Sequence, residues 1–229
     1  MAKLIIIFFH QLKLYFVKSK IIIANSLFFI SFAVIFMMIL SPILTSVYQS
    51  AEINLSFQQK HQSLLICSCI FALICCMLIS ASEFFLSDYH DGTIEQMMIC
   101  CENLEIFIFA KMFANWFCNC FLIIILAMIF LLLFNIEWSI IIKFFWLMIF
   151  SSLLINFICL FSSSISMLDS ASPIIAVIAI PLILPVIIYA NLGIVDDFQS
   201  NLKILIGLNI FLIPILTYLS SMITKIAIE

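Results

Sequence analysis

The side chains with the widest chemical range in this sequence are nine cysteines and three histidines, residue types that bind metals and haem or form disulfides. Their spacing does not suit a shared metal ion, because Cys67 and Cys69 would lie about 200° apart around a helix. Cys100 and Cys101 are adjacent and have no histidine beside them. All the other cysteines lie inside long apolar runs, where cysteine commonly acts as a small apolar side chain. We therefore predict neither a metal site nor a disulfide framework.

Acidic side chains gather in one segment, residues 83–106, which we call the acidic loop. It contains no lysine, and Lys111 is the first basic residue after it. The apolar runs on either side are each long enough to cross a bilayer. A charged loop between two spans is a place where a membrane protein can bind a soluble partner, and we interpret it as a docking site. Its acidic residues are Glu83, Asp88, Asp91, Glu95, Glu102 and Glu105.

A short helix is predicted within the acidic loop. Thr93 and Gln96 match a capping box, in which each side chain bonds a free amide at the helix start, and Gly92 before them permits a sharp entry. Glu95 faces away from an apolar stripe with helical spacing. Such a helix can rest on lipid headgroups or dock into a groove on a basic partner, and repulsion between the acids and anionic lipid favours docking. The stripe consists of Ile94, Met97, Met98 and Cys101.

The rest of the sequence is strongly apolar. Hydrophobic residues make up 66% of the 229 residues and charged residues only 9%, which excludes an ordinary soluble domain. Helices are predicted, because backbone groups in hydrocarbon must be satisfied within their own segment and the apolar runs lack the alternation of a β-barrel. All nine basic residues are lysines, so no bidentate arginine clamp for phosphate exists. We expect no nucleic-acid partner.

These features predict an all-α, polytopic membrane protein that forms a single transmembrane domain over residues 1–229. Residues 1–20 match an interfacial amphipathic helix, with a signal peptide as the alternative. Six spans place both termini on one side, and most of the lysines fall on that side together with the acidic loop, so it is predicted to be the cytoplasm. The predicted spans lie near 21–44, 63–82, 107–134, 138–161, 174–190 and 204–224.

Two groups of residues inside the predicted spans have a physical meaning of their own. Lys111, Asn115 and Asn119 are four residues apart on one face of the third span. Such a polar stripe either packs against other helices, the more common case, or contacts a substrate. Pro181 and Pro185 in the fifth span each free a backbone carbonyl and tend to kink the helix. They are either tolerated by neighbouring helices or form a hinge or a broken helix along a translocation path.

Two motifs in the chain resemble those of a known family. The first is Asp88-Tyr-His-Asp-Gly-Thr-Ile-Glu-Gln96, followed by Lys111, and the second is IPLILPVIIYA at residues 180–190. They resemble the cytoplasmic signature loop and the fifth span of haem exporter protein B, the permease subunit of the ABC-type complex in cytochrome c maturation. Chain length and span count agree, so the resemblance covers essentially the whole chain. The family's basic residues before the loop motif and its proline-rich turn after the loop helix are absent here.

The resemblance implies an ABC-2-like permease that has no ATPase of its own. A Walker A loop needs several glycines and a Gly-Lys pair, whereas the three glycines of this chain stand far apart. ATP would be hydrolysed on a partner ABC subunit, and residues 92–102 would form the coupling helix. The other expected partners are a haem-handling membrane subunit, a haem chaperone, a second copy of the chain and the lipid of a bacterial-type inner membrane. The expected coupling residues are Asp88, Asp91, Gly92, Glu95, Gln96, Met97 and Met98.

Haem is the substrate that the resemblance implies, either exported through the complex or delivered by release of a haem-loaded chaperone. We expect no cofactor bound by this chain itself. Histidine is the usual axial ligand of haem, but His61 is predicted at the outer edge of the second span while His10 and His90 are cytoplasmic, so no pair faces across one cavity. Two other functions stay open. One is an ABC permease for a lipid or a drug, and the other is a membrane-embedded enzyme, for which the spans offer no acid–base pair.

Overall fold

The computed structural model of the chain describes its helical segments, and every structural statement below refers to those residues. Within them no strand occurs. The described ranges are 7–9, 11–13, 19–50, 57–81, 84–100, 103–134, 136–168, 173–195 and 197–228.

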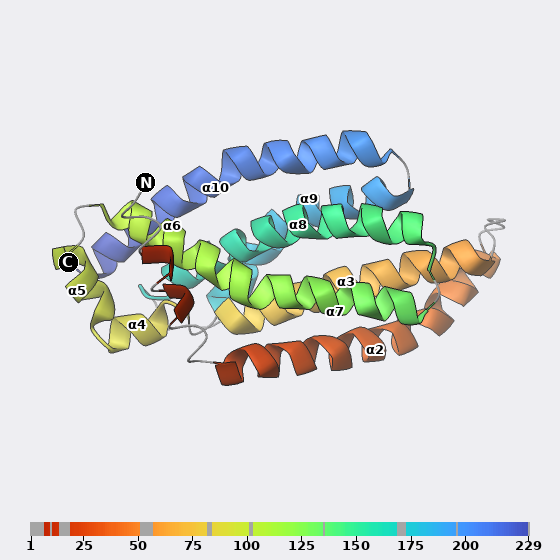
Figure 1. The fold of residues 1–229 in the computed structure, drawn as a ribbon, viewed down its shortest axis with the longest axis horizontal. Helices are drawn as coiled ribbons and strands as arrows, with labels where there is room; N and C mark the ends of the chain where they lie inside the picture. The colour runs from red at the N-terminus through yellow and green to blue at the C-terminus, as the bar shows by residue number, and fades with distance from the viewer. Residues whose placement is uncertain are drawn as a thin grey trace.

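Long helices lie side by side along the long axis of the molecule, and successive ones run in opposite directions (Figure 1). The pass that follows the acidic loop consists of three consecutive segments, in which one π-helical turn, η1, separates two α-helices. The long elements are α2 (Ser19–Ser50), α3 (Phe57–Ala81), α6 (Leu104–Asn115), η1 (Trp116–Cys120), α7 (Phe121–Leu133), α8 (Trp138–Ile165), α9 (Pro173–Val195) and α10 (Phe198–Ile228).

Five described helices are long and apolar enough to cross a membrane, which confirms the prediction of an all-α, multi-pass membrane protein. In α2 the described apolar stretch, Ile22–Ile35, is shorter than these five. The count of six spans therefore stays a prediction. The five candidate spans are Leu65–Tyr89, Leu104–Leu133, Trp138–Ile165, Ile175–Ile194 and Phe198–Ile228.

Several helices continue beyond the span bounds expected from the sequence. Helix α10 has 31 residues, a length of about 46 Å at 1.5 Å per residue, whereas the hydrocarbon core of a bilayer is about 30 Å thick. The connection between the first two expected spans, 21–44 and 63–82, is likewise shorter, because α2 ends at Ser50 and α3 begins at Phe57. Hydropathy locates the part of a helix that fits the hydrocarbon, and backbone hydrogen bonding carries the helix on into the polar region.

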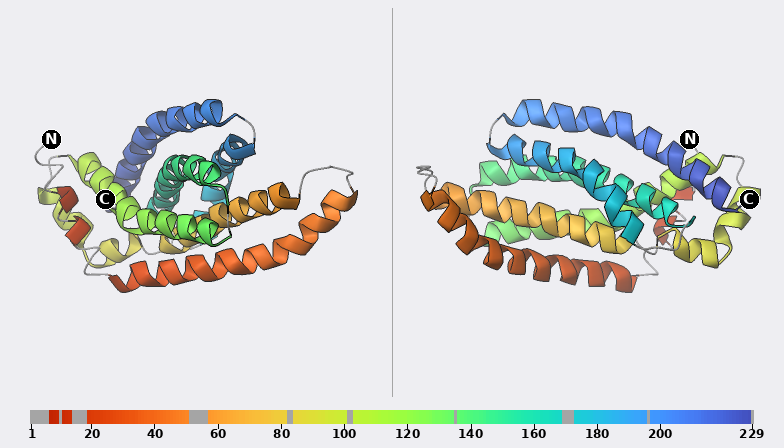
Figure 2. Two further views of the ribbon diagram at one scale, coloured as in Figure 1. Left: turned by 45° about the vertical axis from the view of Figure 1, so that its right-hand side comes forward. Right: turned by 180° about the vertical axis from the view of Figure 1, so that it is seen from behind.

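The two ends of the bundle differ in what they carry. The first described residues, 7–9 and 11–13 (dark red), the end of α10 and the short helices α4 (Leu86–His90) and α5 (Thr93–Cys100) all lie at one end (Figure 1). The α7–α8 and α9–α10 connections lie at the other end (Figure 2). The acidic loop and the final helix end therefore share one side of the bundle.

Helix α8 is the centre of the bundle. It contacts α3, α6, η1, α7, α9 and α10, and the left view of Figure 2 shows it enclosed by its neighbours. In α8, 67% of the most apolar stretch is buried, compared with 28% in α9 and 22% in α10. Helices α9 and α10 therefore expose most of their apolar surface to whatever surrounds the protein, and α8 holds the other helices together.

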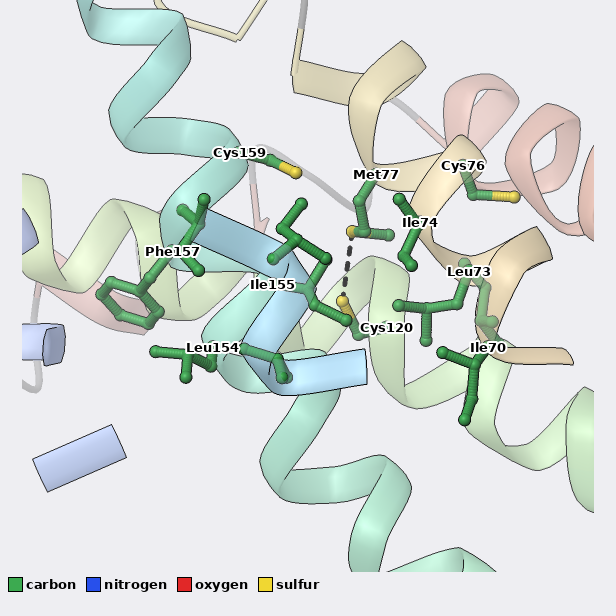
Figure 3. Close-up of a cluster of buried hydrophobic side chains, with 14 of the residues drawn as sticks. Ile70, Leu73, Ile74, Cys76, Met77, Cys120, Leu154, Ile155, Phe157 and Cys159 are labelled. Atoms are coloured by element: carbon green, nitrogen blue, oxygen red, sulfur yellow. Dashed lines mark hydrogen bonds between the residues drawn. The ribbon is translucent and has the colours of Figure 1, made fainter. Parts of the chain in front are cut away.

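Four of the described cysteines, Cys69, Cys76, Cys120 and Cys159, belong to the buried apolar core. Cys120 lies with its sulfur 3.3 Å from that of Met77, among Leu73, Ile74 and Ile155 of α3 and α8 (Figure 3). All the cysteines whose side chains are described are free thiols. Among the described residues no group of three or more His, Cys, Asp or Glu side chains is placed to hold a metal ion.

The turn between α9 and α10 is held by Asp197. Its carboxylate accepts a hydrogen bond from the Ser200 hydroxyl at 2.5 Å and one from the Gln199 N–H at 3.2 Å. These bonds, the Ser200 contact first, hold the pKa of the Asp197 carboxyl below its ordinary value. The side chain acts as the N-cap of α10 and satisfies free amides at the helix start.

Gly193 permits close packing of α9 on its neighbours. A Cβ atom at this position would lie 2.9 Å from Cδ2 of Leu147 in α8 and 3.3 Å from Cβ of Asn201 in α10. The Leu147 side chain has some freedom to move, whereas a Cβ atom moves only with its backbone. The absence of a side chain at Gly193 therefore lets α9 pack closely on both α8 and α10.

Gly193→Ala is expected to lower the free energy of unfolding by about 1 kcal/mol, because overpacking at this contact exceeds the gain in helix propensity. The measurement is the thermal unfolding midpoint in detergent. Gly207→Ala is the matched control, because a Cβ at Gly207 of α10 meets nothing within 4 Å. A Gly193 variant as stable as the Gly207 variant would contradict the packing argument.

Candidate functional site

The acidic loop folds into two short helices joined by a tight turn. Helix α4 ends with the Asp91 N–H bonded to the Ser87 carbonyl at 3.0 Å and the Gly92 N–H bonded to the Tyr89 carbonyl at 3.2 Å. Gly92 has φ +67°, in the left-handed region that glycine enters at little cost. It therefore lets the chain leave α4 and enter α5 within two residues, as its place in the sequence predicted.

The start of α5 differs from the predicted capping box. The Thr93 hydroxyl donates to the carbonyl of Asp88 at 3.0 Å, and the Gln96 N–H bonds the carbonyl of Gly92 at 3.3 Å. Gly92, not Thr93, is thus the residue that precedes the helix, and the prediction of Thr93 as the cap was wrong. The Thr93 side chain turns back to a free carbonyl of α4, because α4 ends only a few residues earlier and leaves that carbonyl within reach.

Helix α5 turns one face inward and its charged face outward. Ile94, the first residue of the predicted apolar stripe, is 3% exposed, whereas Asp91, Glu95 and Gln96 are exposed. The side chains of Met97 and Met98 lie outside the described ones, as do residues Glu83, Cys101 and Glu102. The described part of the loop therefore presents Asp91 and Glu95 at the end of the bundle.

Asp88 is less exposed than the other described acids of the loop. Its Oδ2 lies 2.6 Å from Nζ of Lys111, and the two side chains are 23% and 4% exposed. The same Nζ donates to the carbonyl of Phe84 at 3.2 Å and lies 4.4 and 4.6 Å from the ring centres of Phe84 and Phe85. From the sequence we placed Asp88 in the loop and Lys111 in a separate polar stripe. The structure joins them, and the sequence signals for this were that Lys111 is the first cation after the acidic run and that it follows Asp88 in the same motif.

The remaining residues of the polar stripe form a ladder of buried amides. Asn119 donates through Nδ2 to Oδ1 of Asn115 at 2.7 Å, and Asn115 donates in the same way to Asn156 of α8 at 2.7 Å. Asn156 in turn donates to the carbonyl of Met112 at 3.1 Å. The ladder ties α6 and η1 to α8, and sequence reasoning did not identify Asn156 as its third member.

The ladder coincides with the π-helical turn η1. Within that turn Trp116 donates through Nε1 to the Ser152 hydroxyl of α8 at 3.1 Å. Asn119 Oδ1 is buried with no hydrogen-bond partner among the described residues. π-Helical turns commonly occur where a helix meets a functional constraint, and here the constraint is the set of polar contacts to α8.

Pro181 and Pro185 lie within a single helix. Helix α9 continues from Pro173 to Val195 through both, and both side chains are exposed on the outside of the bundle. The alternative of a broken helix was therefore wrong, because the helix closes around the two missing amides without losing its helical backbone. A hinge at these residues stays a prediction.

Described residues near both ends of the chain make contacts at the side of the acidic loop. The Tyr89 hydroxyl donates to the carbonyl of Ala227 near the end of α10 at 3.3 Å. The ring of Phe8, in the described part of the predicted interfacial helix, lies 5.7 Å from that of Phe113 and 6.5 Å from that of Phe117. The rest of residues 1–20 lies outside the described residues, apart from the first turn of α2.

The histidine side chains also lie outside the described part of the structure, those of His10, His61 and His90 alike. Haem ligation by His61 was an open question of the sequence and stays one.

Comparison with known proteins gives one family. A family model described as CcmB protein matches residues 2–226, nearly the whole chain. No curated protein gives a significant match to the chain.

Proposed function

The chain belongs to the CcmB family, and from this premise we propose that its acidic loop couples ATP hydrolysis on a separate subunit to movement of the helical bundle. Members of this family are membrane permease components of an ABC-type haem exporter in cytochrome c maturation, and are transporter subunits, not classical enzymes. The family is part of a larger exporter complex. What needs an account is how this chain engages its partners.

Two exposed acids carry the proposal. Asp91 lies in the turn before α5 and Glu95 lies on α5, the helix that buries Ile94, and both side chains are exposed. A carboxylate pair at the start of a small helix complements a basic groove on a soluble partner. The partner is the ATPase subunit, because the glycines of this chain are too widely separated to form a phosphate-binding loop.

The coupled movement serves haem delivery. Two forms of this function fit the family: haem itself crosses the complex, or ATP drives the release of a haem-loaded chaperone from a haem-handling membrane subunit. In both, this chain turns closure of the ATPase into a conformational change, as part of an assembly with a second copy of itself and two ATPase subunits. A permease for a lipid or drug is the remaining alternative.

The test is purification of the protein in detergent from its native membrane, with mass spectrometry of the proteins that accompany it. Recovery of an ATP-binding subunit together with a haem-handling membrane protein is the expected result. An ATPase recovered without a haem-handling partner would keep the permease and overturn its role in haem delivery. Recovery of no ATPase would overturn the docking function of the acidic loop.

The topology that goes with this proposal has six spans in the inner membrane, with both termini and the acidic loop in the cytoplasm. The described residues 7–9 and 11–13, α5 and the end of α10 lie at one end of the bundle (Figure 1), and the lysine bias favours the cytoplasm for that end. Reporters fused before Met1 and after Glu229 are expected to be cytoplasmic, and one inserted between Glu137 and Trp138 is expected at the outer face. A Met1 reporter at the outer face would overturn the topology.

A further inference from the structure

We propose that Lys111 anchors the acidic loop to the transmembrane bundle through its ion pair with Asp88, and that loop movement enters the bundle at this residue. The inference rests on the proposed coupling function, and it assigns Asp88 an internal role instead of a place in the partner interface. Asp91 and Glu95 remain the residues that face the partner.

Four groups at the start of the loop converge on the Lys111 ammonium. The Asp88 carboxylate lies 2.6 Å away, the Phe84 carbonyl accepts a hydrogen bond at 3.2 Å, and the two phenylalanine rings face the charge at 4.4 and 4.6 Å. Phe84 and Phe85 are themselves buried, at 8% and 1% exposure. A buried ammonium is costly to leave without its counter-charge. The position of α4 is therefore tied to that of α6.

A second contact ties the same short helix to the end of the chain. Tyr89 follows Asp88 and bonds the Ala227 carbonyl of α10. Helix α4 thus contacts both α6, through Asp88, and α10, through Tyr89. Asp91 in the following turn and Glu95 of α5 are the exposed acids beside it. A force applied to α5 therefore has a route to the long helices through the described polar contacts of α4, in addition to the chain that joins α5 to α6.

A movement of Lys111 reaches the central helix of the bundle through the next polar side chain of α6. Asn115 is one helical turn further along α6 on the same face as Lys111, and its amide is bonded to Asn156 of the central helix α8. Movement of α6 at Lys111 therefore changes the strain on the buried Asn115–Asn156 hydrogen bond to α8. The loop, α6 and α8 form one connected set of polar contacts.

The experiment compares Asp88→Asn and Lys111→Met with Asp91→Asn, in the complete complex and in the purified chain. The first readout is hydrogen–deuterium exchange of the amides of residues 86–96 in the purified chain. The second is the amount of ATPase subunit that co-purifies, and the third is the yield of c-type cytochrome in cells. Lys143→Met, an exposed lysine at the opposite end of the bundle, is the control for loss of a lysine.

We expect Asp88→Asn and Lys111→Met to speed exchange in the loop by about tenfold or more, since the loop then opens locally. They should lower cytochrome yield while the ATPase subunit is retained. Asp91→Asn should give the opposite pattern, with normal exchange and less ATPase. The charge swap Asp88→Lys with Lys111→Asp should slow exchange again relative to the single variants, which distinguishes an ion pair from a shape requirement and covers the case in which a single variant folds poorly.

Unchanged loop exchange in both single variants would overturn the anchor. Loss of the ATPase from Asp88→Asn with unchanged exchange would also overturn it, because Asp88 would then face the partner. If the unaltered protein binds no ATPase, the proposed coupling function fails, and the exchange measurement on the chain alone still decides whether Lys111 holds the loop.

Discussion

Reversing Glu95 of α5 and Asp91 of the turn before it, Asp91→Lys with Glu95→Lys, is expected to reduce the ATPase subunit that co-purifies with this protein by about tenfold or more. The two side chains are exposed at the end of the bundle, so their replacement disturbs no described packing. Opposed like charges at an interface cost several kcal/mol, while insertion of the chain depends on its apolar helices. The measurement is quantitative mass spectrometry of the detergent-purified complex.

The control for this experiment is Glu137→Lys, which reverses an exposed acid at the opposite end of the bundle. It should leave ATPase recovery unchanged. Circular dichroism of both proteins checks that the helical content is intact. Normal ATPase recovery with the double reversal would contradict the assignment of α5 as the docking helix, whatever the anchor at Lys111 does.

Asn156→Leu is expected to lower the free energy of unfolding by about 2–3 kcal/mol. Asn156 is fully buried and both accepts a bond from Asn115 and donates one to the Met112 carbonyl. Leucine satisfies neither the Asn115 amide nor the Met112 carbonyl. Each buried polar group left without a partner costs about 1–3 kcal/mol. Alternative partners inside a membrane protein reduce such costs. The measurement is the denaturation midpoint in detergent or lipid.

The companion variant is the double replacement Asn115→Leu with Asn156→Leu. Removal of both partners leaves fewer unsatisfied groups than removal of one, so the double variant should be less destabilised than the sum of the two single variants. A single Asn156 variant as stable as the original protein would show that the ladder contributes nothing to the stability of the bundle.

The architecture follows from the sequence alone to a large extent. The apolar runs that predict spans two to six are helices α3, α6 to α7, α8, α9 and α10, because a backbone in hydrocarbon has almost no alternative to the helix. The helix inside the acidic loop, its sharp entry at Gly92 and the outward position of Glu95 also follow from local patterns. Each of these features depends on neighbours within one or two helical turns, and local sequence records such neighbours directly.

The contacts that connect the residues of the candidate site did not follow from the sequence, because they depend on the tertiary structure. Helical spacing places Lys111, Asn115 and Asn119 on one face, but it does not say that this face meets Asp88 at one end and Asn156 further along. It also did not reveal that Pro181 and Pro185 lie on the outside of an unbroken α9, or that Thr93 turns back to α4. These features depend on segments that are distant in the chain or on the ends of adjoining helices. They are fixed only when each helix packs on its neighbours in one rotation about its axis and one position along it. Periodicity defines the face of a helix, whereas packing in three dimensions selects its neighbour.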